Sequence, residues 1–143
     1  MARIRVSTTI DAAPAVVWED LRHIDRHVEW MRDAVSIAFT SEQAEGVGTA
    51  FTCLTRVGPF RTSDRMVVTQ WAEGAAMGIR HEGAVTGQGR FTLEPDGDGT
   101  RFTWAEELRF PWWMGGALGA TVAAPVLKLV WRRNLRDLKG RFA

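Results

Sequence analysis

The segment from Ile10 to Met31, IDAAPAVVWEDLRHIDRHVEWM, decides how the rest of the chain is interpreted. It follows an alternating stretch at 3–10, which is typical of a half-buried strand. Pro14 suits the first turn of a helix, where a missing amide hydrogen costs nothing, and apolar residues then recur at helical spacing. Asp25 is expected to cap a second short helix that ends near Trp30. The segment therefore predicts a strand followed by two short helices.

Six more strand-like stretches fill the middle of the chain and are separated by turn residues. The intervals between the breaks hold no helix of crossover length, so they predict antiparallel hairpins and exclude a doubly wound parallel sheet. With the first strand they give an antiparallel sheet of about seven strands. The stretches are 34–41, 48–57, 60–72, 76–82, 86–94 and 100–110, with breaks that include Gly58-Pro59 and residues 95–99.

The closing segment, 115–142, is predicted to be one long helix that covers the sheet. Pro125 is expected either to kink this helix or to mark its true start. The run 110–127 has no charged residue and reaches the lower limit for a membrane span, but its glycines and the need of the sheet for an apolar cover argue against one. The helix is amphipathic from residue 128 onward. Its polar side carries Lys128, Arg132, Arg133, Arg136 and Lys139, and its apolar side carries Leu127, Val130, Trp131, Leu135, Leu138 and Phe142.

Three short motifs resemble the START-like (SRPBCC) superfamily, and within it the polyketide cyclase/dehydrase and lipid-transport group. They are Ala13-Pro14 with Val17-Trp18, the Trp30-Met31 pair, and the close from Arg133-Asn134-Leu135 to Leu138-Lys139. The resemblance spans essentially the whole chain, with Val28 standing where the family usually has a proline. It implies an α+β helix-grip fold, a single domain over 1–143, and a cavity between the curved sheet and the last helix for an apolar molecule.

Composition narrows the class of protein. The 143 residues suffice for one domain with a single core. Eighteen basic and seventeen acidic residues give no overall attraction to nucleic acid. One cysteine, Cys53, excludes an internal disulfide, and no charged-then-apolar leader precedes the first strand, so a cytoplasmic location is expected. Tyrosine is absent, so the abundant Trp and Phe bring almost no phenolic acid/base capacity.

Glu106 is the first candidate for chemistry, because it shares one strand face with Phe102, Trp104 and Leu108. An unpaired buried carboxylate is costly, so Glu106 is either functional, with a raised pKa, or held in water or a structural ion pair near the strand end. Both interpretations stay open.

His81 is the second candidate, and its direction depends on the turn that follows its strand. If residues 83–85 form a three-residue turn, the inward set continues through Gly87 and Gly89, and Gly89 lies opposite Glu106, where a missing side chain leaves room for a ligand. A two-residue turn would place His81 on the other face relative to these glycines. A functional and a purely structural histidine are both open.

Other reactive residues give weaker signals. His23 and His27 have the spacing of two helical metal ligands, but the expected cap at Asp25 separates them and no third ligand is evident. They are expected to be solvated loop histidines, and no metal site is predicted. Cys53 is expected to be a buried, inert thiol. The chain lacks a nucleophile elbow, a phosphate loop and a dinucleotide fingerprint, so no cofactor is predicted.

These observations favour a protein that binds or carries a hydrophobic small molecule, lipid-like or polyaromatic, with His81 and Glu106 orienting it. The alternative is an enzyme resembling polyketide aromatase/cyclases, in which the two residues form an acid/base pair. A third alternative is a membrane or protein-partner module that uses Trp112-Trp113 and the basic helix face, although a solvated face is the simpler expectation. Ligand identity, turnover and oligomeric state stay open. The predicted ligand contacts are Trp30, Phe51, Met66, Val68, Ile79, His81, Phe91, Trp104, Glu106, Trp112, Trp113, Leu118 and Val122.

Overall fold

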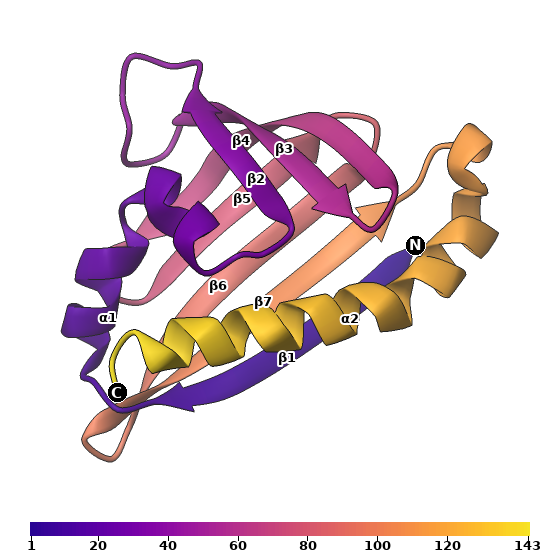
Figure 1. Ribbon diagram of the computed structural model, residues 1–143. Helices are drawn as coiled ribbons and strands as arrows, with labels where there is room; N and C mark the ends of the chain where they lie inside the picture. Colours follow the sequence, from indigo (N-terminus) through magenta and orange to yellow (C-terminus); the bar gives the residue numbers. More distant parts are fainter.

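A single antiparallel sheet with its covering helices makes up the structure, a computed structural model that describes residues 1–143 (Figure 1). Seven strands, two α-helices and two short 3-10 helices follow one another along the chain. In order they are β1 (Ala2–Ile10), α1 (Pro14–Leu21), η1 (Ile24–Glu29), β2 (Ala34–Phe39), β3 (Ala50–Val57), β4 (Phe60–Ala72), β5 (Ala76–Glu82), β6 (Thr86–Asp96), β7 (Gly99–Arg109), η2 (Trp112–Met114) and α2 (Gly116–Gly140).

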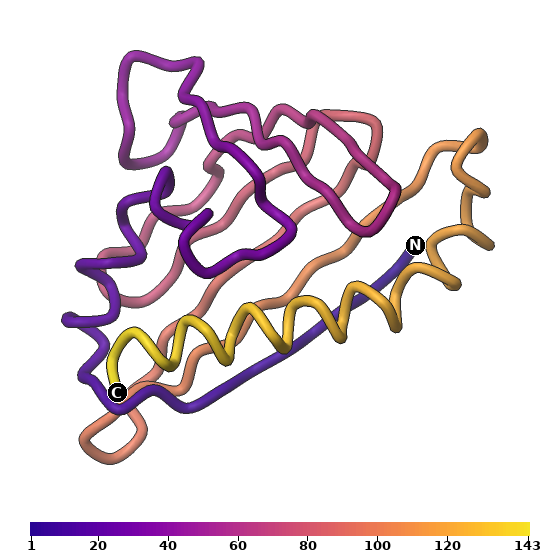
Figure 2. Tube along the Cα trace, in the orientation of Figure 1, coloured from indigo at the N-terminus to yellow at the C-terminus, as the bar shows by residue number.

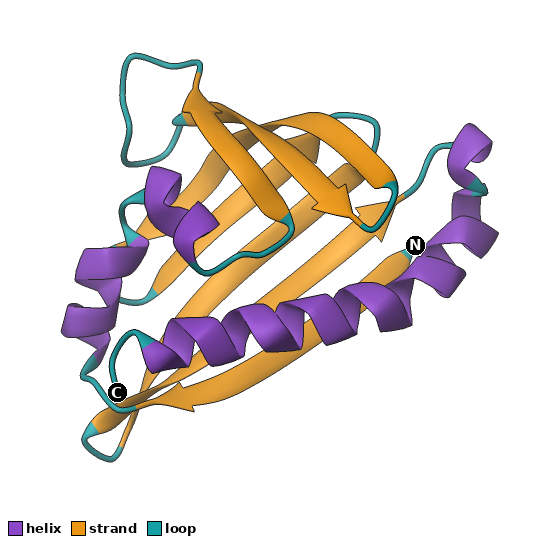
Figure 3. Ribbon diagram, viewed as in Figure 1, coloured by secondary structure: helices purple, strands orange, loops and turns teal.

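The sheet has the strand order β1-β7-β6-β5-β4-β3-β2, and all neighbouring strands are antiparallel. It curves around α2, which packs mainly on β1 (Figure 3). Register shifts in β2 and β4 are irregularities of the kind that bend a strand and increase its twist. Together α1 and η1 cover one end of the concave face (Figure 1). This architecture confirms the predicted helix-grip fold.

The turn between β5 and β6 fixes which side chains face the interior. Residues 83–85 form it, so the three-residue alternative holds. His81 pairs with Gly87, and Gly89 pairs with Glu106. A slip of one residue would turn every side chain of a strand to the opposite face, and this register therefore brings His81 and Glu106 to the same side of the sheet.

The next hairpin is tighter than expected. Strand β6 continues through Asp96 and β7 starts at Gly99, so the predicted break at 95–99 shrinks to Gly97-Asp98. Gly97 has a φ of 59°, a left-handed conformation that favours glycine. This glycine lets the two strands stay paired up to the turn.

Aromatic side chains join the elements in the core. The ring of Trp30 lies 5.9 Å from Phe91, 6.4 Å from Phe102 and 6.1 Å from Trp104, measured between centroids. Trp104 in turn stacks on Trp131 of α2 at 4.6 Å. Such pairs add to the stabilisation that burial itself provides. One core is thus shared by Trp30 after η1, the middle of the sheet and the second half of α2.

The long helix α2 begins at Gly116 and runs through Pro125 without a break. Pro125 therefore does not mark the start of the helix. Trp131, Leu135 and Leu138 are buried on its inner side, as the amphipathic pattern predicted. None of the helices combines the length and hydropathy that a membrane crossing requires.

Candidate functional site

A histidine and a carboxylate meet on the concave face of the sheet. His81 on β5 donates from Nε2 to Oε2 of Glu106 on β7, at 2.6 Å. The other carboxylate oxygen, Oε1, accepts a hydrogen bond of 3.1 Å from the indole nitrogen of Trp104. Glu106 is 5% exposed, and its neighbours on the inner face of β7 are buried as well. The carboxylate is thus paired at both oxygens, and its neighbours on the inner face of β7 are apolar.

Glycines on the intervening strand β6 make this pairing feasible. His81 and Glu106 lie on strands that do not touch, and Gly87 and Gly89 face them across the ladders. A Cβ atom at position 89 would overlap the Glu106 carboxylate. The sequence predicted that the missing side chain leaves room for a ligand; the structure shows that the Glu106 side chain fills this room.

Electrostatics favour a protonated His81. Burial lowers the pKa of the imidazole, but the negative charge of Glu106 and the hydrogen bond to it outweigh burial, so the pKa is raised above its ordinary value. Asp64 raises it further through its charge. The pair is therefore an imidazolium beside a carboxylate at pH values where a free histidine is mostly neutral.

One polar atom of the pair is free. Nδ1 of His81 has no hydrogen-bond partner in the protein, whereas Nε2 is bonded to Glu106. No fully buried side-chain nitrogen or oxygen lacks a partner, so Nδ1 is not fully buried. An imidazolium donates from both nitrogens. Nδ1 is therefore a hydrogen-bond donor that is available to a ligand.

Asp64 on β4 is a buried carboxylate that the sequence analysis did not single out. Its side chain accepts a hydrogen bond of 3.0 Å from the backbone amide of Ala84, and a Cβ at Gly83 would overlap it. Asp64 thereby holds the β5–β6 turn beside His81. The signal was present, because Asp64 alternates with the inward-facing Met66 and Val68 along its strand.

Most of the predicted ligand contacts lie on the inner face. The structure brings together Trp30, Phe51, Met66, Val68, Phe91, Trp104 and Glu106, which are buried, with Ile79 and His81, which are partly buried. Their contact with a ligand stays a prediction.

Four predicted contacts do not share this interior. Trp112, Trp113, Leu118 and Val122 are 86%, 61%, 74% and 65% exposed. The physical reason is the helical period, because the inner line of α2 passes through Ala120 and Trp131 and leaves positions 118 and 122 on the opposite side. The indole that stacks on Trp104 is accordingly Trp131, rather than Trp112 or Trp113.

The second short helix also differs from expectation. It begins at Ile24 with His23 at its N-cap, so Asp25 lies in the first turn and does not cap it. His27 is not solvated: it is 5% exposed, and its Nε2 donates to the carbonyl oxygen of Leu21 at 2.8 Å. Burial lowers its pKa to about 4, so this histidine is neutral. No group of three residues suited to holding a metal is present.

Cys53 lies on the inner face of β3 and is buried, as predicted. Burial raises the pKa of its thiol, and its sulfur lies 3.7 Å from the hydroxyl oxygen of Thr55. A thiol with a raised pKa is a poor nucleophile at neutral pH. This supports an inert packing role.

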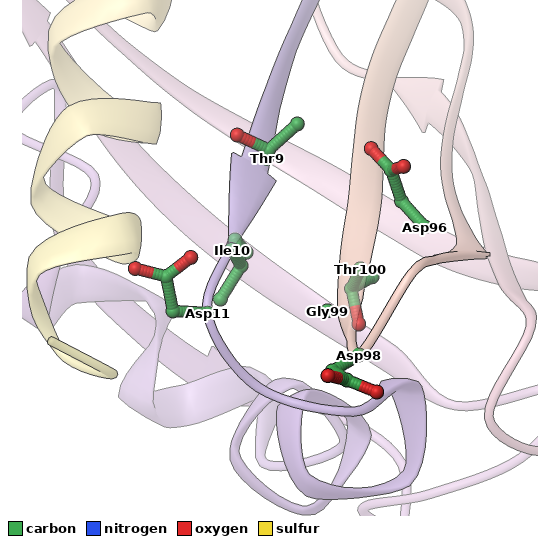
Figure 4. Close-up of a pocket in the computed structure, with 7 residues that line it drawn as sticks. All are labelled: Thr9, Ile10, Asp11, Asp96, Asp98, Gly99 and Thr100. Carbon is green, nitrogen blue, oxygen red and sulfur yellow. The ribbon is translucent and has the colours of Figure 1, made fainter.

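Two depressions on the surface are lined mostly by polar and charged residues and differ from the predicted wall. The first, of about 310 Å³, is lined by Thr9, Ile10, Asp11, Asp96, Asp98, Gly99 and Thr100 (Figure 4). It lies where β1 ends and β6 turns into β7, at the far end of these strands from Glu106. The second, of about 530 Å³, adjoins His81 and is lined mainly by Arg80, Glu82, Gln88, Glu107 and Arg109, which alternate with the inward residues of their strands.

The curved antiparallel sheet around one long helix is the START-like fold, and known structures share it. A crystal structure of a protein from Thermus thermophilus is similar with a TM-score of 0.82 and 16% identity, covering 98% of this chain and 96% of that one. A START superfamily protein from Mycobacterium smegmatis gives 0.75 and 12%, covering 99% and 97%. The di-domain ARO/CYC StfQ from the steffimycin biosynthetic pathway gives 0.79 and 15%, covering 99% of this chain and 50% of that one. Such low identities show the fold alone.

The family itself is shown by sequence. The model of the polyketide cyclase / dehydrase and lipid transport family matches residues 1–143, and the chain belongs to this family. A comparison with curated proteins found no match.

Proposed function

We propose that the protein binds a hydrophobic small molecule against the concave face of the sheet, with His81 and Glu106 anchoring one polar group of that molecule. The observation that carries the proposal is Nδ1 of His81, which has no partner in the protein and lies on a mainly apolar face whose other charged groups are Glu106 and Asp64. Ligand sites commonly combine apolar walls with a few convergent polar groups. Family membership supports the same conclusion.

The anchor determines the chemistry of the ligand. Both oxygens of Glu106 already accept hydrogen bonds, so what the pair offers a ligand is the donor at Nδ1 of His81. The matching group is an acceptor oxygen, as in a carboxylate, a phenolate or a ketone, on an acyl or polyaromatic body. A hydrocarbon of the same size lacks this interaction and leaves the charged donor unpaired.

The test compares matched ligands on the wild-type protein and on variants of the anchor. A fatty acid and its methyl ester are titrated while tryptophan emission and melting temperature are followed, because Trp104 contacts Glu106 and a ligand of the native state stabilises it. We expect the acid to bind more tightly than the ester, and His81→Gln to remove the difference. Unchanged emission and melting across a panel of aromatic and acyl ligands would contradict the proposal.

A second candidate function is catalysis of the cyclase type, and the same pair favours it. A protonated imidazole with a raised pKa can donate its Nδ1 proton to a carbonyl oxygen while the apolar walls hold a flexible poly-carbonyl chain in a reactive shape. The test is turnover of a poly-carbonyl substrate. We expect His81→Gln and Glu106→Gln each to abolish turnover if this candidate is correct, whereas binding without turnover leaves the carrier function.

A further inference from the structure

Large apolar side chains gather on the outside of the molecule around η2 and the first half of α2. Six of the eleven exposed large hydrophobic residues lie between positions 112 and 129, and Trp112 and Leu118 are the most exposed of all. Isolated exposed apolar residues are normal, but a contiguous group of them marks an interaction site. The six are Trp112, Trp113, Leu118, Val122, Val126 and Leu129.

The corner between η2 and α2 holds the two tryptophans in place. Gly115 and Gly116 have φ values of 90° and 53°, which turn the chain sharply before the helix starts. Gly119 lies against the carbonyl group of Met114, so closely that a Cβ there would overlap it. As a result η2 folds back on α2, and this corner extends beyond the start of β1 (Figure 2).

The apolar surface continues along the helix into a basic one. Positions 118, 122, 125, 129, 132 and 136 succeed one another at intervals of three or four residues, which places them on one line of the helix. We call this line, with the flanking Val126, Lys128 and Arg133, the outer face of α2. It is apolar from Leu118 to Val126 and basic from Arg132 onward, with Lys128 and Leu129 between the two parts, while the opposite side of α2 packs on the sheet.

The basic part of this face is uncompensated. Lys128, Arg132, Arg133 and Arg136 are exposed, and none of them takes part in an ion pair. The only acidic residue of α2, Asp137, is paired with Arg32 at 2.8 Å. The outer face therefore has an apolar part followed by a part with unpaired positive charge. A partner that matches it has an apolar region next to an anionic one.

We propose that η2 and the outer face of α2 dock on an anionic membrane surface. Trp112, Trp113 and Leu118 enter the boundary between headgroups and acyl chains, where tryptophan is favoured. The arginines contact anionic headgroups, which attract basic side chains close to the surface. Interfacial helices combine these two contributions. Docking also brings the bilayer to the end of the sheet that holds His81 and Glu106, because β7 runs directly from Glu106 into η2.

The experiment measures co-sedimentation of the whole protein with vesicles. One set is phosphatidylcholine, and the other is an equimolar mixture of phosphatidylcholine and phosphatidylserine. We expect roughly tenfold tighter binding to the anionic set at 0.1 M salt. This advantage of the anionic set should disappear near 1 M salt, because the Debye length falls from about 10 Å to about 3 Å. Equal binding to the two sets, or none to either, would overturn the proposal.

Variants separate the two contributions. Arg132→Glu with Arg136→Glu should weaken anionic binding roughly tenfold or more, and Trp112→Ser with Trp113→Ser should remove quenching of emission by brominated lipids. The matched control is Arg5→Glu with Arg90→Glu, which makes the same change of charge on the convex face of the sheet and should retain the affinity. An equal loss in the control would show that net charge alone is responsible and would refute a specific face.

Two further measurements keep the result decisive. If the tryptophan variant lowers the melting temperature, Leu118→Gln with Val122→Gln tests the same surface without touching η2. Sedimentation velocity then asks whether a second copy covers the face instead. A dimer that the Trp112→Ser, Trp113→Ser variant dissociates, in a protein that does not bind vesicles, would refute the membrane in favour of self-association.

Discussion

The two ends of the concave face each contain a histidine, and the two histidines are held in opposite ways. At the closed end, under α1 and η1, His27 bonds to a backbone carbonyl and burial lowers its pKa to about 4. At the open end, beside the β5–β6 turn, His81 bonds to a carboxylate and its pKa is raised. The closed end thus holds a neutral group that packs, and the open end holds a charged group with a free donor. We therefore expect the closed end to contribute to stability and the open end to hold the proposed ligand contact.

The two halves of α2 also differ in their polar contacts with the rest of the protein. Near the closed end, Asp33 accepts from the indole of Trp131 at 3.2 Å and from the amide of Asn134 at 2.7 Å. Arg141 just past the helix pairs with Asp20 of α1 at 2.7 Å. The first half of α2 has no comparable attachment, and most of its large side chains are exposed. The second half of α2 is therefore attached to the rest of the protein, whereas the first half is more exposed.

The largest expected effect compares two leucines of α2. Leu138 is 1% exposed and Leu118 is 74% exposed. Leu138→Ala should lower the free energy of unfolding by about 2–5 kcal/mol, because it removes buried surface and leaves a cavity. Leu118→Ala should change it by less than about 0.5 kcal/mol. Urea denaturation measures both, and a similar loss in the two variants would show that the first half of α2 is packed in solution.

The closed-end histidine should make the protein sensitive to acid. The unfolded chain binds a proton at His27 near pH 6.5, whereas the folded protein does so only near pH 4. Stability should therefore be complete above about pH 6.5 and should fall by on the order of 3 kcal/mol as the pH approaches 4. His27→Gln keeps a donor and removes the titration, so its stability curve should lose this part of the slope. Parallel curves for the two proteins would contradict the assignment.

The open end can be disturbed through one glycine. Gly89→Ala places a methyl group where the Glu106 carboxylate lies, so it should separate Glu106 from His81 and destabilise the fold by about 1–3 kcal/mol. Gly140→Ala is the control, because nothing lies within 4 Å of the added atom. It should be neutral or slightly stabilising in a helix. Equal stability of Gly89→Ala and the wild type would show that the carboxylate has another position available.

The sequence predicted the fold and reduced the direction of His81 to two alternatives, because both depend on local rules; the length of the turn at 83–85 then decided between the two. Turn length and strand alternation determine the register, and the register alone brings Gly89 opposite Glu106. The burial of His27 was missed because it depends on how η1 packs against Phe91, a contact between residues far apart in the chain. Trp112 and Trp113 were placed inside because an apolar pattern does not reveal where the sheet ends. Asp64 shows the reverse case, since its inward position followed from alternation but its partner, the Ala84 amide, did not.

The smallest expected effect concerns the ionisation of the open-end histidine. Glu106→Gln removes the main charge that raises the pKa of His81 and leaves only the charge of Asp64 to oppose burial, so the pKa should fall. In the wild type, the added stability is complete below about pH 6.5 and is lost as the pH rises through the raised pKa. The difference in unfolding free energy between wild type and variant, about 1 kcal/mol, should therefore shrink toward alkaline pH.

Titration of the His81 ring protons by NMR measures the pKa directly. Glu107→Gln is the matched control, because Glu107 lies on the outer face, 3.8 Å from Arg3, and should leave the His81 titration unchanged. A His81 pKa that is the same in the wild type and in Glu106→Gln would contradict a charged pair of His81 and Glu106. It would also contradict the difference between a neutral histidine at the closed end and a charged one at the open end.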